Sequence, residues 1–110
     1  MTIHFDLMPL EGRAHGGYRP TRLKLSMSNA NAARMLQILG IEAPVDEAGF
    51  IPNDLLGELL ERATQARTAR LERADRAVRY ELPRLEQFEV LFAEALKKGY
   101  GVLMARTSDD

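Results

Sequence analysis

The chain has 110 residues, of which 45% are hydrophobic and 28% are charged, and its formal net charge is −1. This composition excludes collagenous, low-complexity and wholly disordered proteins, and the length fits one domain that buries roughly two thirds of its unfolded surface. The absence of cysteine and the presence of only two histidines exclude disulfides and a typical zinc site, so we expect no metal and no cofactor. Because no apolar run approaches membrane length and no signal-peptide pattern opens the chain, we expect a cytoplasmic protein that binds no membrane.

Two segments near the N-terminus alternate between apolar and polar residues. They are Thr2–Leu7 and Thr21–Met27, and this alternation is typical of strands with one buried face. We expect the two strands to pair as a long-looped hairpin. Residues 8–20 between them contain two prolines and three glycines, which predict a long loop rather than a packed element.

A first helix is predicted directly after the second strand. Ser28 or Asn29 can cap its first turn, and Gly40 ends it, with Ile41 placed for the apolar contact that accompanies a left-handed helix stop. The run LKLSMSNANAARMLQILGI, residues 23–41, resembles a pattern in small bacterial proteins of unassigned function, in which a strand precedes S-N-x-N-A-x-x-x-L-x-x-L-G. The resemblance implies a compact α+β fold and carries no catalytic residues over to this chain.

A second helix is predicted after a connection over residues 42–53, with Asn53 as its cap. Its dense apolar face consists of Leu55, Leu56, Leu59, Leu60 and Ala63. At 100° per residue, Arg67 and Arg70 would fall on the same face. Because a core and unpaired charges do not share one face, we expect the helix to stop or bend near Ala66, or to continue past the body of the protein as a solvated projection.

The last third of the chain predicts a third helix followed by a final strand. Residues 77–82 alternate and are compatible with a short additional strand. Pro83 fits a first helical position, and Lys97 and Lys98 favour the negative helix end before Gly99. The core-facing residues of this helix are predicted to be Leu85, Phe88, Leu91, Phe92, Ala95 and Leu96. The apolar run GYGVLMA then predicts a buried strand, and residues 106–110 a frayed acidic tail.

The second helix and the residues after it carry an excess of arginine. Six arginines against three acids lie between Glu61 and Arg79. Three of them have an acid four residues before them, which stabilises a solvated helix; these pairs are Glu58–Arg62, Glu72–Arg76 and Asp75–Arg79. Arg67, Arg70 and Arg73 have no such partner. They are therefore candidates to contact phosphates or an acidic protein groove, with an ordinary solvated helix as the alternative.

The glycine-rich loop offers a second candidate surface. Arg13, His15, Tyr18 and Arg19 lie beside its glycines, whose backbone amides can approach an anion. The spacing matches no phosphate-binding fingerprint, and a plain turn explains the composition, since loops of this composition are common. Neither His4 nor His15 has a partner at a spacing that suggests catalysis.

The sequence therefore predicts one α+β domain over residues 1–110, with a small mixed or antiparallel sheet of three to four strands against a single layer of two or three helices. Because no catalytic motif is visible, we expect a non-enzymatic protein-interaction module, such as a bacterial or phage-encoded accessory, inhibitor or immunity-type factor. The alternatives are a nucleic-acid or nucleotide binder that uses the Arg62–Arg79 segment, and an enzyme whose site assembles from scattered residues. We also expect a homodimer through the leucine-rich helix if the sheet leaves its leucines uncovered.

Overall fold

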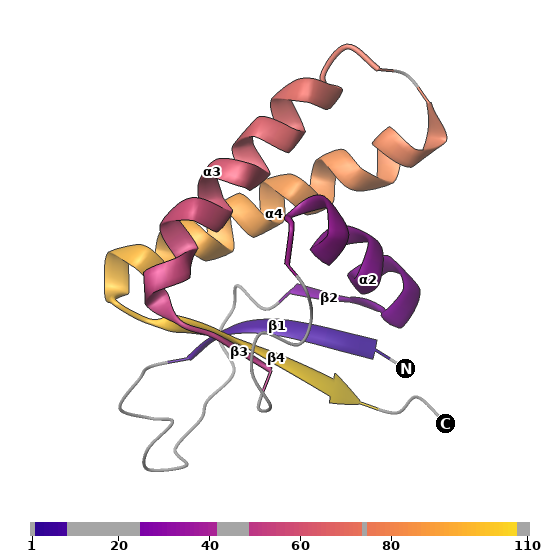
Figure 1. Ribbon diagram of the computed structural model, residues 1–110. Coiled ribbons are helices and arrows are strands. Elements are labelled where there is room, and N and C mark those ends of the chain that lie inside the picture. The colour runs from indigo at the N-terminus through magenta and orange to yellow at the C-terminus, as the bar shows by residue number, and fades with distance from the viewer. Residues whose placement is uncertain (1, 9–24, 42–48, 74, 108–110) are drawn as a thin grey trace.

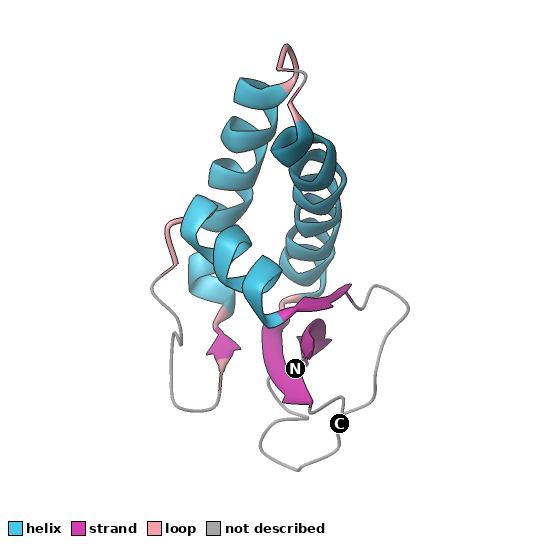
Figure 2. Ribbon diagram, turned by 90° about the vertical axis from the view of Figure 1, so that its right-hand side faces the viewer, coloured by secondary structure: helices cyan, strands magenta, loops and turns pink. Residues whose placement is uncertain are grey.

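The computed structural model describes residues 2–8, 25–41, 49–73 and 75–107. In chain order its elements are β1 (Thr2–Met8), β2 (Leu25–Ser28), α2 (Asn29–Ile38), β3 (Phe50–Ile51), α3 (Asn53–Arg70), α4 (Arg76–Lys98) and β4 (Gly101–Thr107). The strands form one antiparallel sheet in the order β2-β1-β4-β3. The helices lie on one side of this sheet (Figures 1 and 2). The predicted α+β class is confirmed.

The inner strand β1 carries the centre of the core. Its alternate residues Ile3, Phe5 and Leu7 are buried, and Phe5 lies opposite Leu25 of β2 and Met104 of β4. The ring of Phe5 meets Phe88 of α4 edge to face, with centroids 5.0 Å apart. The predicted pairing of the first two strands is confirmed. Residues 9–24, which connect β1 to β2, lie outside the described residues.

Helix α2 begins and ends where its local signals predict. The Ser28 hydroxyl accepts a hydrogen bond from the Asn31 amide at 3.3 Å, which satisfies one of the free amides of the first turn. Gly40 has φ +72°, a conformation that glycine adopts at little cost. The Ile41 amide then donates to the Leu36 carbonyl at 2.9 Å, which closes the expected left-handed stop.

Strand β3 was not predicted and lies inside the connection expected over residues 42–53. Two glycines make it possible. A Cβ atom on Gly49, which has φ +64°, would lie 2.4 Å from the Met104 carbonyl oxygen, and a Cβ atom on Gly101 would lie 2.3 Å from the ring of Phe50. Both glycines therefore allow the backbone of β3 to approach β4. Residues 42–48 lie outside the described residues.

Asn53 has a different role from the one predicted. The residue before the first turn of α3 is Pro52, and no side chain caps this helix. The Asn53 amide group instead donates to the Tyr100 carbonyl at 2.8 Å. This bond ties the start of α3 to the turn between α4 and β4, so the side chain fixes tertiary packing and not the helix end.

Residues 77–82, whose alternation is compatible with a short strand, instead form the first turns of α4. The Asp75 carboxylate caps this helix by accepting a hydrogen bond from the Val78 amide at 3.1 Å. Pro83 thus lies inside α4 and not at its start. The helix ends at Gly99 as predicted, and β4 continues to Thr107, so residues 106 and 107 belong to the sheet and not to a frayed tail.

Candidate interaction site

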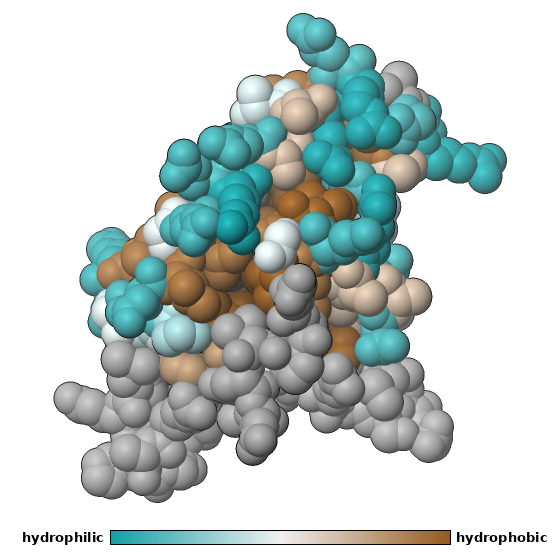
Figure 3. Space-filling view, viewed as in Figure 1, coloured by the Kyte–Doolittle hydropathy of each residue, from teal (hydrophilic) through white to brown (hydrophobic). Residues whose placement is uncertain are grey.

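Helices α3 and α4 form an antiparallel hairpin whose far end projects away from the sheet (Figures 1 and 2). Its lower part is apolar. Leu56, Leu59 and Ala63 of α3 belong to the same buried cluster as Phe88 and Phe92 of α4. On the face shown in Figure 3, apolar side chains gather over the middle and lower parts of the helices, and hydrophilic side chains dominate the distal part.

Beyond Ala63, ion pairs connect α3 to α4. Of the two alternatives expected near Ala66, a stop there is wrong, since α3 continues to Arg70, and the hairpin projects past the sheet instead. The face that carries Arg67 and Arg70 is not simply solvated, because both arginines pair with acids of α4. The Nε atom of Arg67 donates to both carboxylate oxygens of Glu89, at 3.0 and 2.8 Å. Arg67 and Glu89 are both partly buried. Charge and core thus share one face of α3, because α4 supplies the opposite charge.

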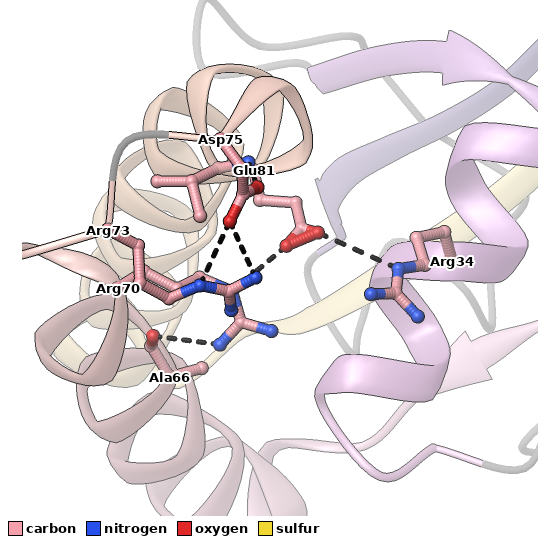
Figure 4. Close-up of polar contacts among 7 residues, drawn as sticks. Arg34, Ala66, Arg70, Arg73, Asp75 and Glu81 are labelled. Carbon is pink, nitrogen blue, oxygen red and sulfur yellow. Dashed lines mark hydrogen bonds and ion pairs between the residues drawn. The ribbon is translucent and has the colours of Figure 1, made fainter.

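A second ion pair lies deeper and nearer the end of the hairpin. The Arg70 Nε atom donates to Glu81 Oε1 at 2.9 Å, and Arg70 Nη1 donates to the Ala66 carbonyl at 3.0 Å. The side chains of Arg70 and Glu81 are 14% and 2% exposed. Glu81 Oε2 lies 3.6 Å from Arg34 Nε of α2 and accepts no hydrogen bond. One buried carboxylate therefore faces arginines from two other helices (Figure 4).

This arrangement makes Glu81 a structural group. A carboxylate withdrawn from water loses several kcal/mol of hydration, which an ion pair must offset. Arg70 provides that offset through a direct hydrogen bond, and Arg34 adds a second positive charge from the more exposed side. Loss of Arg70 would leave a buried charge with only the longer Arg34 contact.

The end of the hairpin has its own polar structure. Arg73 Nη2 donates to Asp75 Oδ2 at 2.9 Å, and both side chains are about half exposed. The pKa of Asp75 is lowered from its ordinary value, first by the hydrogen bond from the Val78 amide and also by Arg73. Val78 beneath them is buried but lies outside the main core cluster. The described residues at the end of the hairpin thus form a small unit joined by these contacts.

We call this unit the hairpin tip and define it as Leu71–Arg73 with Asp75–Arg79. Leu71 is 56% exposed. Arg76 and Arg79 are exposed, and neither forms an ion pair with an acid in the described part of the chain. Sequence reasoning assigned Arg76 and Arg79 to pairs with Glu72 and Asp75, but Asp75 caps α4 and pairs with Arg73. The predicted Glu58–Arg62 pair is formed.

The predicted contact residues therefore separate into three groups. Arg67 and Arg70, which have no acid four residues before them, are held within the hairpin by acids of α4 that are distant in sequence. Arg73 lies at the tip, paired with Asp75. The loop residues Arg13, His15, Tyr18 and Arg19 lie outside the described residues. His4 is paired on the sheet, where its Nδ1 lies 2.6 Å from the Ser26 hydroxyl.

The leucine-rich face of α3 is mostly used inside the chain. Leu56 and Leu59 are buried, Leu60 is partly buried, and Leu55 is 39% exposed. A homodimer through this face would therefore rest on Leu55 and the exposed edge of Leu60. The homodimer stays a prediction.

Neither metal chemistry nor relatives point to a function. The described residues contain no group of three histidine or acidic side chains that could hold a metal ion. None of the helices in this part of the chain combines the length and apolar character that crossing a membrane requires. No protein-family model matches the chain, and comparison with curated proteins and solved structures finds no significant match.

Proposed function

We propose that this chain is a small non-enzymatic protein-interaction module that presents the hairpin tip to its partner. The observation that carries the proposal is the exposed Leu71 at the end of a projecting hairpin. The hairpin holds this end in place through the Arg67–Glu89 and Arg70–Glu81 pairs. A contact surface fixed before binding loses less conformational entropy when a partner docks.

The small size of the chain fits a protein that acts by occupying a surface of another protein. An accessory, inhibitor or immunity-type factor of a bacterium or a phage works in this way, because steric occlusion needs a shaped surface and no reacting group. Helical hairpins suit this task, since the end of the hairpin can enter a groove while the sheet anchors its base.

In-cell photocrosslinking tests the proposal at a single position. A photoreactive amino acid replaces Leu71 in cells that make the protein naturally, and the same amino acid replaces Val90 in the control. The two side chains are 56% and 55% exposed, so random collision affects both equally. We expect one protein adduct of defined mass from position 71 and none from position 90. Equal adduct patterns from both positions, or no adduct from position 71, would contradict the proposal.

A further inference from the structure

We infer that the hairpin tip binds an acidic groove on a partner protein and that Arg76 and Arg79 form ion pairs with the carboxylates of this groove. The inference rests on the proposed function and deepens it by naming the chemistry of the partner. The inference follows from a difference among the arginines: some form ion pairs within the chain, whereas Arg76 and Arg79 form none in its described part.

The fold uses the arginines nearer the sheet. Arg62 pairs with Glu58 and donates to the Leu39 carbonyl at 3.1 Å. Arg67 and Arg70 pair with acids of α4. These guanidinium groups are therefore occupied by contacts within the chain, and binding a partner through them would break those contacts.

Arg76 and Arg79 are in the opposite situation. They are exposed, three residues apart and on neighbouring turns of one helix, and the acids of the described tip do not pair with them. They also lie in the first turns of α4, where the helix dipole disfavours positive charge. Arg76 in particular, as the first residue of the helix, gains nothing from the helix dipole. Carboxylates of a partner would neutralise them through charge-assisted hydrogen bonds.

The rest of the tip favours a protein partner over a nucleic acid. Leu71 is more than half exposed and would be desolvated in an apolar pocket, which a phosphate backbone does not provide. A groove with carboxylates around an apolar pocket matches both the arginines and the leucine.

A peptide selection with the full-length protein tests the partner chemistry. The probe is a phage-displayed library of random peptides, and the selected peptides are then titrated by fluorescence anisotropy. We expect enrichment of Asp and Glu beside an apolar residue. The Arg76→Gln and Arg79→Gln double variant should weaken binding of these peptides by at least about tenfold, the effect of losing one charge-assisted hydrogen bond.

The matched control is the double variant Lys97→Gln and Lys98→Gln, which removes the same charge from the opposite end of α4. We expect it to bind the selected peptides as the parent does. Circular dichroism of both double variants checks that the helices remain folded. A selection without acidic enrichment, or equal weakening by both double variants, would overturn the inference.

Two further results separate this inference from the proposed function. Adducts from position 71 together with selected peptides that lack acids would leave the interaction module standing and overturn the acidic partner. Titration of single- and double-stranded oligonucleotides at about 50 and 200 mM salt tests the competing partner class. Salt-sensitive oligonucleotide binding that disappears in the Arg76→Gln and Arg79→Gln variant would also overturn the inference, since the arginines would then read phosphates.

Discussion

The Nε atom of Arg70 on α3 lies 2.9 Å from Oε1 of Glu81 on α4, and Glu81 is almost fully buried. The other oxygen of the same carboxylate faces Arg34 on α2 at 3.6 Å. Three helices thus meet at one charge that has little access to water. The Arg70–Glu81 pair lies between α3 and α4 beyond the apolar core cluster, where the pair takes the place of apolar contacts between the helices. It therefore holds the two helices together in this part of the hairpin.

The apolar part of the hairpin should respond strongly to truncation. Leu59→Ala and Phe92→Ala each remove a buried side chain from the core cluster, and each should lower the free energy of unfolding by about 2–5 kcal/mol. Denaturant midpoints measure the effect. Val90→Ala, at an exposed position of α4, is the control and should change stability by less than about 0.5 kcal/mol. A Leu59 or Phe92 variant as stable as the control would show that its helix face is wrongly assigned.

The two glycines Gly101 and Gly57 should respond to alanine in opposite directions. A Cβ atom at Gly101 would meet the Phe50 ring at 2.3 Å, whereas one at Gly57 on α3 meets nothing within 4 Å. Gly101→Ala should therefore destabilise the protein by about 1–3 kcal/mol through overpacking. Gly57→Ala should stabilise it by about 0.5–1 kcal/mol, because alanine favours the helix. Thermal unfolding that gives both variants the same sign would contradict the described packing of β3 on β4.

Asp75 should make stability depend on pH in the acid range. Its folded pKa lies below the ordinary value of 3.8, chiefly because the Val78 amide donates to the carboxylate. The stabilisation is therefore complete above the ordinary pKa and is lost as the pH falls through the lower folded pKa. Asp75→Asn keeps a capping oxygen but has no charge to lose.

Melting temperatures of the parent and of Asp75→Asn, measured from neutral pH down into the acid range, test this expectation. The parent should melt at the higher temperature at neutral pH, and the difference should vanish once Asp75 is protonated. A difference that stays constant over the whole range would show that the charge of Asp75 contributes nothing to the cap.

The local parts of the fold could be predicted from sequence because their signals are local. Ser28 and Gly40 mark the ends of α2, and Gly99 marks the end of α4. The alternation of β1 predicts its buried face. Strand β3 could not be predicted because its two residues are too few to show an alternation of apolar and polar side chains. Its position also depends on close contacts of Gly49 with Met104 and of Gly101 with Phe50, which are distant in sequence.

The charged part of the hairpin could not be predicted from sequence spacing. The buried residues at the start of α4 are Val78, Glu81 and Leu85, which are spaced as on one face of a helix. Because Glu81 is charged, the sequence shows no continuous apolar pattern on this face. The partners of Arg67 and Arg70 are separated from them by 22 and 11 residues. Rules for pairs within one helix do not reach that far. A buried charge becomes predictable only when the opposite helix is known.

Whether Arg70 serves the fold or a partner is tested most directly by a double-mutant cycle with Glu81. Arg70→Met leaves the buried carboxylate without its hydrogen bond and should cost about 3–5 kcal/mol of unfolding free energy. The double variant Arg70→Met and Glu81→Leu removes both charges and should return to within about 1 kcal/mol of the parent. Denaturant unfolding of the parent, both single variants and the double variant gives the coupling energy. An Arg70→Met variant as stable as the parent, or costs that simply add in the double variant, would contradict the structural role of the pair.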